Sequence, residues 1–96
     1  ATDAALTKPQ AARLALAAQD GIALAVYPAH TPLDGDTVFT LATGGRAAPR
    51  TPADFVELTA AASAVLARAI ARGVHAATPR AGSPLPAWSE RFAAAR

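Results

Sequence analysis

Two carboxylates that flank a glycine form the most chemically suggestive feature of the sequence. Asp34 and Asp36 enclose Gly35 immediately before an apolar run that begins at Thr37. Carboxylates so placed can orient or activate a nucleophile that another part of a protein supplies. Asp-Gly is also a common turn pair, and spacing alone favours a solvated turn without chemistry. The residues by themselves leave both interpretations open.

The other polar side chains do not form a recognisable catalytic or metal-binding set. His30 and His75 are far apart in the sequence, and without cysteine they do not make a metal-ligand set. The sequence around each serine lacks the pattern of a nucleophile presented on a strand-to-helix turn. The serines are Ser63, Ser83 and Ser89. We therefore expect neither a metal nor a cofactor.

A helix is expected before the acidic turn. Thr7 can cap its start, Pro9 lies in the first turn, and Gln10 occupies the position of a capping box. Apolar residues then recur every three or four positions, which is the pattern of one helix face. The helix should end near Tyr27, because Pro28 disfavours a helical conformation in the residue before it.

A β-strand is expected directly after the acidic turn. Residues 37–43 are rich in β-branched and aromatic side chains and lie between Gly35 and a glycine pair at 44–45. Residues 44–50 then predict an exposed loop. A short strand is also expected at the start of the chain, so the sheet would have one or two strands from this sequence.

The second long helix is the most regular element. Thr51 can cap it, Pro52 occupies its first position, and apolar residues follow at helical spacing to about Gly73. Residues 78–96 predict an irregular C-terminal tail, whose segment 88–92 can pack against the body. The chain is thus expected to be a single α/β domain of residues 1–96.

Composition predicts a thin hydrophobic core. Hydrophobic residues make up 52% of the 96 residues, but many of them are alanine and aromatic residues are only 5%. Alanine buries little apolar area, and burial contributes about 25 cal/mol per Å². We therefore expect an apolar face that a partner completes.

Charge and hydropathy exclude several classes of protein. The net charge is +2, and the single lysine and eight arginines are scattered, without the basic face of a nucleic-acid reader. No apolar run approaches the ~20 residues that span a bilayer. The start resembles no signal peptide, so we expect a cytoplasmic protein with no nucleic-acid or membrane partner. It also lacks an initiator methionine, which fits cleavage or truncation.

One string of residues resembles a known family. His30–Phe39 followed by Leu41–Gly44 is similar to the C-terminal portion of the L-aminopeptidase/D-esterase family, which is peptidase family S58. Ala1–Ala4, Gln19–Gly21 and Leu85–Trp88 match the same region. Relatives include β-peptidyl aminopeptidases and nylon-oligomer hydrolases. The resemblance covers essentially the whole chain.

The resemblance implies a self-processing hydrolase. In this family a precursor cleaves itself into two chains, and the new N-terminal Ser or Thr of the small chain is the nucleophile. Its free α-amino group, with a pKa of about 7.7–8.0, can act as the base. On this alignment the nucleophile lies about six residues before Ala1. Asp36, as a carboxylate that holds the amine, and Asp34 are the candidate catalytic residues.

The resemblance also implies an architecture and partners. The chain would be part of a four-layer α-β-β-α sandwich, contributing two long helices and one or two strands. Its partners would be the large chain of the same precursor, further copies in a homo-oligomer, and a small peptide, amide or ester substrate. The chain alone should be inactive. The alternatives are a non-catalytic assembly module of this fold and, with less support, a subunit like those of ornithine acetyltransferases.

Overall fold

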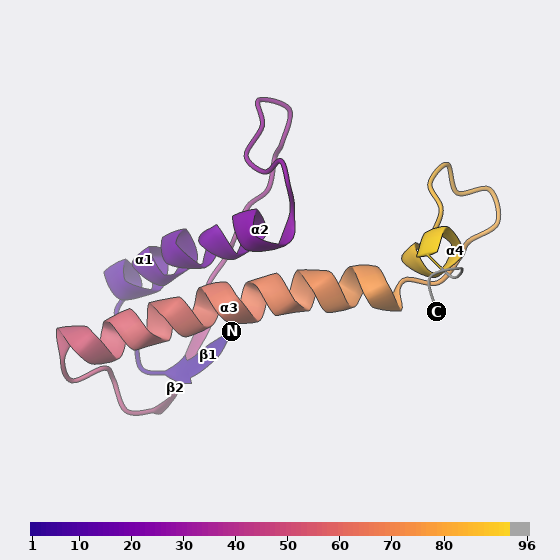
Figure 1. The fold of residues 1–96 in the computed structure, drawn as a ribbon. Coiled ribbons are helices and arrows are strands. Elements are labelled where there is room, and N and C mark those ends of the chain that lie inside the picture. The colour runs from indigo at the N-terminus through magenta and orange to yellow at the C-terminus, as the bar shows by residue number, and fades with distance from the viewer. Residues whose placement is uncertain (93–96) are drawn as a thin grey trace.

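Helices lie along one side of two short strands in the computed structural model, which describes residues 1–92 (Figure 1). The elements in chain order are β1 (Thr2–Ala4), α1 (Lys8–Ala18), α2 (Asp20–Ala25), β2 (Ala42–Arg46), α3 (Pro52–Ala76) and α4 (Trp88–Phe92). The mixture of helices with a parallel sheet confirms the α/β class.

The sheet pairs the start of the chain with its middle. β1 and β2 are parallel, with Thr2 level with Ala42 and Ala4 level with Arg46. Four steps along β2 therefore match two along β1, so β2 contains a bulge. Gly44 lies in this bulge at a φ of 73°, a conformation that glycine adopts without steric cost.

The predicted strand begins and ends several residues before the observed strand β2. A strand was expected over residues 37–43 and a loop over 44–50, whereas β2 begins at Ala42 and continues to Arg46. A strand needs a hydrogen-bonded neighbour, and β1 begins at Thr2, which is level with Ala42. Within the described chain, residues 37–41 thus precede the paired part of the sheet.

Both long helical regions begin with the predicted caps. The Gln10 side chain accepts a hydrogen bond from the Thr7 N–H at 2.9 Å, while Thr7 Oγ1 accepts one from the Gln10 N–H. Asp54 and Thr51 form the same reciprocal pair at the start of α3. These caps satisfy backbone N–H groups that have no partner within the helix.

The first helical region is not one continuous helix, as had been expected, but two. It is interrupted at Gln19 and ends at Ala25 rather than near Tyr27. At the interruption the Ile22 N–H donates to the Gln19 carbonyl at 3.0 Å, three residues back. This tighter turn separates α1 from α2.

Close contact between α2 and α3 holds the helical layer together. A Cβ atom on Gly21 would collide with the Ser63 carbonyl oxygen and lie 2.9 Å from Leu66 Cβ. The Ser63 hydroxyl also donates to the Ala17 carbonyl at 2.8 Å. Within residues 1–92 the buried hydrophobic residues are Leu14, Ala18 and Ile22. This small set confirms the thin core.

The C-terminal segment contacts the end of α3. The tail expected over residues 78–96 is irregular up to α4, where Trp88 packs against His75 with ring centroids 4.7 Å apart. Phe92 extends this aromatic cluster. The segment thus contacts the C-terminal end of α3; residues 93–96 of the predicted tail lie outside the described part.

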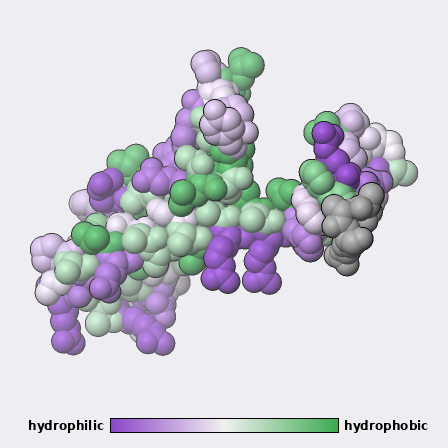
Figure 2. Space-filling model, viewed as in Figure 1, coloured by the Kyte–Doolittle hydropathy of each residue, from purple (hydrophilic) through white to green (hydrophobic). Residues whose placement is uncertain are grey.

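The chain is extended for its length. Its radius of gyration is 16.7 Å, against about 12–13 Å for a compact domain of this size. Apolar side chains reach solvent over the helices and over the long connection that projects from α2 (Figure 2). Much of the apolar surface therefore has no covering layer within the described residues.

Candidate functional site

The acidic turn lies in the connection between α2 and β2, which projects away from the helices (Figure 1). Asp34, Gly35 and Asp36 are all exposed. The turn itself runs from Thr31 to Asp34, with residues 32–33 in its middle, so Asp34 closes it, while Gly35 and Asp36 follow in an extended segment rather than in the turn, where they were expected. Both carboxylates are accessible from solvent.

Asp34 closes the turn with its own side chain. Its Oδ2 accepts a hydrogen bond from the Thr31 N–H at 2.8 Å, and its N–H donates to the Thr31 carbonyl at 3.0 Å. The preceding residue, His30, has a positive φ of 57°. The hydrogen bonds from Thr31, with a smaller contribution from the charge of His30, lower the pKa of Asp34. The carboxylate is therefore ionised at neutral pH.

Asp36 is differently placed from Asp34. No hydrogen bond or ion pair reaches its carboxylate from residues 1–92. The neighbouring contact is the Thr37 hydroxyl, which donates to the Gly35 carbonyl at 3.4 Å. One carboxylate of the pair thus has a structural task in the turn, while the other is available to a group from outside the described residues.

The extended segment after the turn alternates like a strand. Val38 and Thr40 are partly buried, whereas Phe39 and Leu41 are 86% and 65% exposed. The Thr2 N–H donates to the Leu41 carbonyl at 2.9 Å, where pairing with β1 begins. At about 3.3 Å per residue, the turn lies roughly 17 Å from this point along the sheet.

An apolar hollow of about 300 Å³ lies beside this segment. Its walls come from the start of β1, from Val38 to Thr40, and from the faces of α1 and α3, including Leu58 and Leu66. The hollow therefore follows the side of residues 38–40 that faces the helices.

The other candidate side chains have structural contacts or remain isolated. The described part of the chain contains no cluster of three His, Cys, Asp or Glu side chains that could hold a metal ion. His30 and His75 are not brought together; His75 packs on Trp88 instead. The Ser63 hydroxyl is hydrogen-bonded to backbone carbonyls of α1 and α3.

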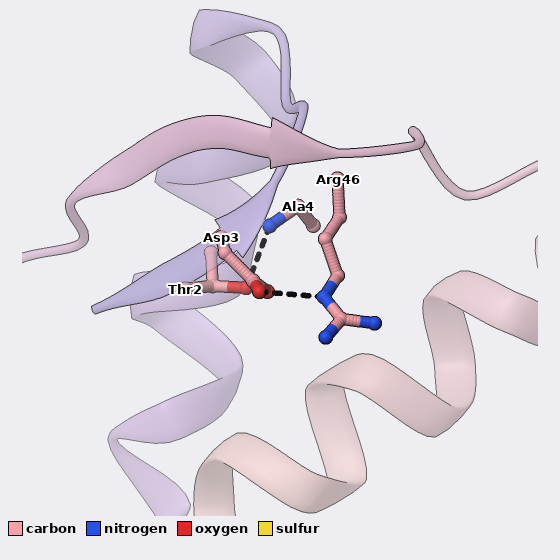
Figure 3. Close-up of polar contacts among 4 residues, drawn as sticks. All are labelled: Thr2, Asp3, Ala4 and Arg46. Atoms are coloured by element: carbon pink, nitrogen blue, oxygen red, sulfur yellow. Dashed lines mark hydrogen bonds and ion pairs between the residues drawn. The ribbon is translucent and has the colours of Figure 1, made fainter.

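One ion pair was not anticipated from the sequence. Arg46 Nε donates to Asp3 Oδ2 at 2.8 Å, linking β2 to β1 (Figure 3). The two residues are distant in sequence, and only the parallel register brings them together, so no local pattern could reveal them. Both side chains are largely exposed, and such pairs contribute little to stability.

Among the described residues, no helix is both long enough and apolar enough to cross a bilayer. The cytoplasmic location expected from the sequence remains a prediction.

Comparison with known proteins identifies relatives across most of the chain. Residues 1–84 match peptidase family S58. The chain is 50% identical to uncharacterised aminopeptidases of Mycobacterium bovis and Mycobacterium tuberculosis over 94 aligned positions, which cover 88% of this chain. It is 48% identical to an uncharacterised aminopeptidase of Mycobacterium leprae, again over 88% of this chain. No solved structure shows a significant match.

These relatives are considerably longer proteins. The chain spans 27% of the length of the Mycobacterium tuberculosis relative and 26% of the Mycobacterium leprae relative. The family match nevertheless includes the acidic turn, β1, β2 and all of α3. Since that match takes in 84 of the 96 residues, the chain belongs to peptidase family S58.

Proposed function

We propose that this chain is the small-chain part of a self-cleaving amidohydrolase that removes N-terminal residues or hydrolyses small amides and esters. Family membership and relatives named as aminopeptidases support a peptidase function. The observation that carries the site is the exposed acidic turn, in which Asp34 is held by Thr31 while Asp36 is left without a partner in the described residues.

In the proposed reaction an N-terminal Ser or Thr upstream of Ala1 supplies the attacking hydroxyl. Its oxygen attacks the substrate carbonyl carbon, its proton passes to the α-amino group, and that proton then leaves with the departing amine. Water hydrolyses the resulting ester. Asp36 would hold the amine in place as it becomes positively charged, and Asp34 would keep the turn in shape and add negative charge beside it.

Exposed apolar surface supports a large-chain partner. Phe39 and Leu41 are apolar and largely exposed in the extended segment. The accessible surface is 7465 Å², whereas a compact protein of this mass would expose roughly 5,100 Å². The chain thus exposes roughly 2,400 Å² more accessible surface than a compact protein of its mass, an area comparable to that buried in obligate interfaces. A second sheet over this surface would complete the expected sandwich, and further copies would form the oligomer.

Intact-mass spectrometry with N-terminal sequencing of the full-length protein tests this function. We expect a small chain that begins with Ser or Thr a few residues before Ala1 and elutes with a larger chain. Asp36→Asn should slow self-cleavage or turnover about a hundredfold, without changing the assembled mass. Asp3→Asn is the matched control, because it makes the same chemical change at an exposed carboxylate far from the turn, and it should leave both rates unchanged.

A non-catalytic assembly module is the second candidate. The use of Asp34 in closing its own turn favours it, because a purely structural role would explain that residue completely. A full-length protein that remains a single uncleaved chain, or whose rates are unaffected by Asp36→Asn, would support this alternative over the hydrolase.

A further inference from the structure

The C-terminal segment contacts α3 through an aromatic pair. α4 packs on the end of α3, where the ring centroids of His75 and Trp88 are 4.7 Å apart and the two ring planes are tilted by 48°. The Phe92 ring, one turn further along α4, lies 5.4 Å from the Trp88 ring. His75 is exposed and Trp88 is 37% exposed. The contact therefore depends on a small area that water reaches.

Hydrogen bonds inside the segment keep its local shape. The Ser83 hydroxyl donates to the Leu85 carbonyl at 2.9 Å, and Glu90 Oε2 accepts a hydrogen bond from the Ala87 N–H at 2.8 Å. Both bonds join residues of the segment itself. They would survive if the segment left α3, so the contact between α3 and α4 decides where the segment lies.

The charge of His75 changes the strength of this contact. The face of an indole ring attracts a cation whose centre lies within about 6 Å of the ring centroid, and the imidazole of His75 meets this distance from Trp88. A neutral imidazole keeps only the ring-to-ring contact. His75 also lies in the last turn of α3, but the carbonyl groups there face it whether α4 is docked or released. Protonation therefore strengthens docking through Trp88.

Other charged groups near His75 come from both helices and from the connection between them. Arg72 precedes His75 by about one turn of α3, Arg80 lies in the connection, and α4 contains Glu90 and Arg91. Within residues 1–92 no ion pair joins Glu90 to His75. The three arginines are exposed, so water and salt weaken their repulsion of a charged imidazole. This repulsion opposes the attraction of the indole ring without removing it.

We propose that His75 and Trp88 form a pH-sensitive clip, which holds residues 78–92 against the end of α3 when His75 is protonated and releases them as the pH rises. Histidine side chains change charge between about pH 5 and 8, so the clip works in that range. Release would uncover the last turn of α3 and free the segment for other contacts. The clip uses only residues of this chain and does not depend on the proposed function.

Hydrogen exchange of α4 with millisecond labelling tests the clip. The Glu90 and Arg91 amides donate to the Ala87 carbonyl, and docking of this short helix protects them. After correction for intrinsic exchange rates, we expect their protection to be about two- to fivefold greater near pH 5 than near pH 8, which is the strength of an exposed cation–π contact. Equal protection at the two pH values would overturn the proposal.

Variants of the two histidines assign the effect. His75→Gln should remove the pH dependence and leave low protection throughout, whereas His75→Arg keeps a cation and should retain high protection near pH 8. His30→Gln is the matched control, since His30 is the other histidine of the sequence and lies in a different segment; it should behave like the unaltered protein. A pH dependence that survives in His75→Gln, or that is lost in His30→Gln, would refute the clip.

Tryptophan fluorescence gives a second measurement, because Trp88 is the only tryptophan of this sequence. The bimolecular rate constant for quenching by acrylamide, corrected for the excited-state lifetime, reports how accessible the indole ring is. This rate constant should be lower near pH 5 than near pH 8 in the unaltered protein and in His30→Gln. A rate constant that does not change with pH would contradict release of the segment.

Discussion

Replacing Gly21 by alanine tests the contact on which the helical layer depends. The added Cβ would collide with the Ser63 carbonyl and lie 2.9 Å from Leu66 Cβ, so α2 must move away from α3. Overpacking of this kind costs about 1–3 kcal/mol, and the better helix propensity of alanine offsets up to about 1 kcal/mol. We expect a net loss of about 1–2 kcal/mol in the free energy of unfolding.

The assay is thermal unfolding of the protein, followed by calorimetry or circular dichroism. The expected loss corresponds to a Tm lower by about 4–16 °C for a domain of about this size. Gly73→Ala is the matched control, since Gly73 lies in α3 with no atom within 4 Å of the added Cβ. It should raise stability by about 0.4–1 kcal/mol. If both substitutions raised the Tm, the close approach of α2 to α3 would be refuted.

Three further predictions concern the caps, the tail and the turn. Thr51→Ala removes the side-chain oxygen that caps α3 and should cost about 1 kcal/mol in denaturant unfolding. Trp88→Ala removes the contact with His75, so α4 should detach and its amides should exchange faster, while those of α3 stay protected. The pKa of Asp34 is lowered by the hydrogen bonds from Thr31. Its carboxylate therefore stabilises the turn above about pH 3.9, and this contribution disappears as the pH falls below that value through the folded-state pKa. An NMR titration should show the Thr31 amide shifting with the Asp34 carboxyl, and a Thr31 amide indifferent to pH would contradict the hydrogen bond.

Helix starts were predictable because their signals are local. Thr7 with Gln10 and Thr51 with Asp54 form capping boxes within four residues, and the structure contains both. The interruption at Gln19 was not predictable in this way. It occurs where α2 approaches α3, and that approach joins residues more than forty positions apart.

Strand limits depend on a neighbour rather than on the strand's own residues. Propensity favours residues 37–43 equally along their length, but among the described residues pairing with β1 begins at the Leu41 carbonyl and continues from Ala42. The Asp-Gly pair predicted a turn at residues 34–36, whereas the turn has residues 32–33 in its middle and ends at Asp34. The different surroundings of Asp34 and Asp36 could not be predicted from the sequence, because they depend on how the Thr31 backbone is oriented.

The run Val38 to Leu41 also has a consequence for handling the protein. It combines aliphatic, aromatic and β-branched residues without a charge, and Phe39 and Leu41 are largely open to solvent. Such a segment is a template for intermolecular β-pairing. Produced alone, the chain should therefore aggregate more readily as its concentration rises. A partner chain that covered this run, as in the proposed function, would protect it.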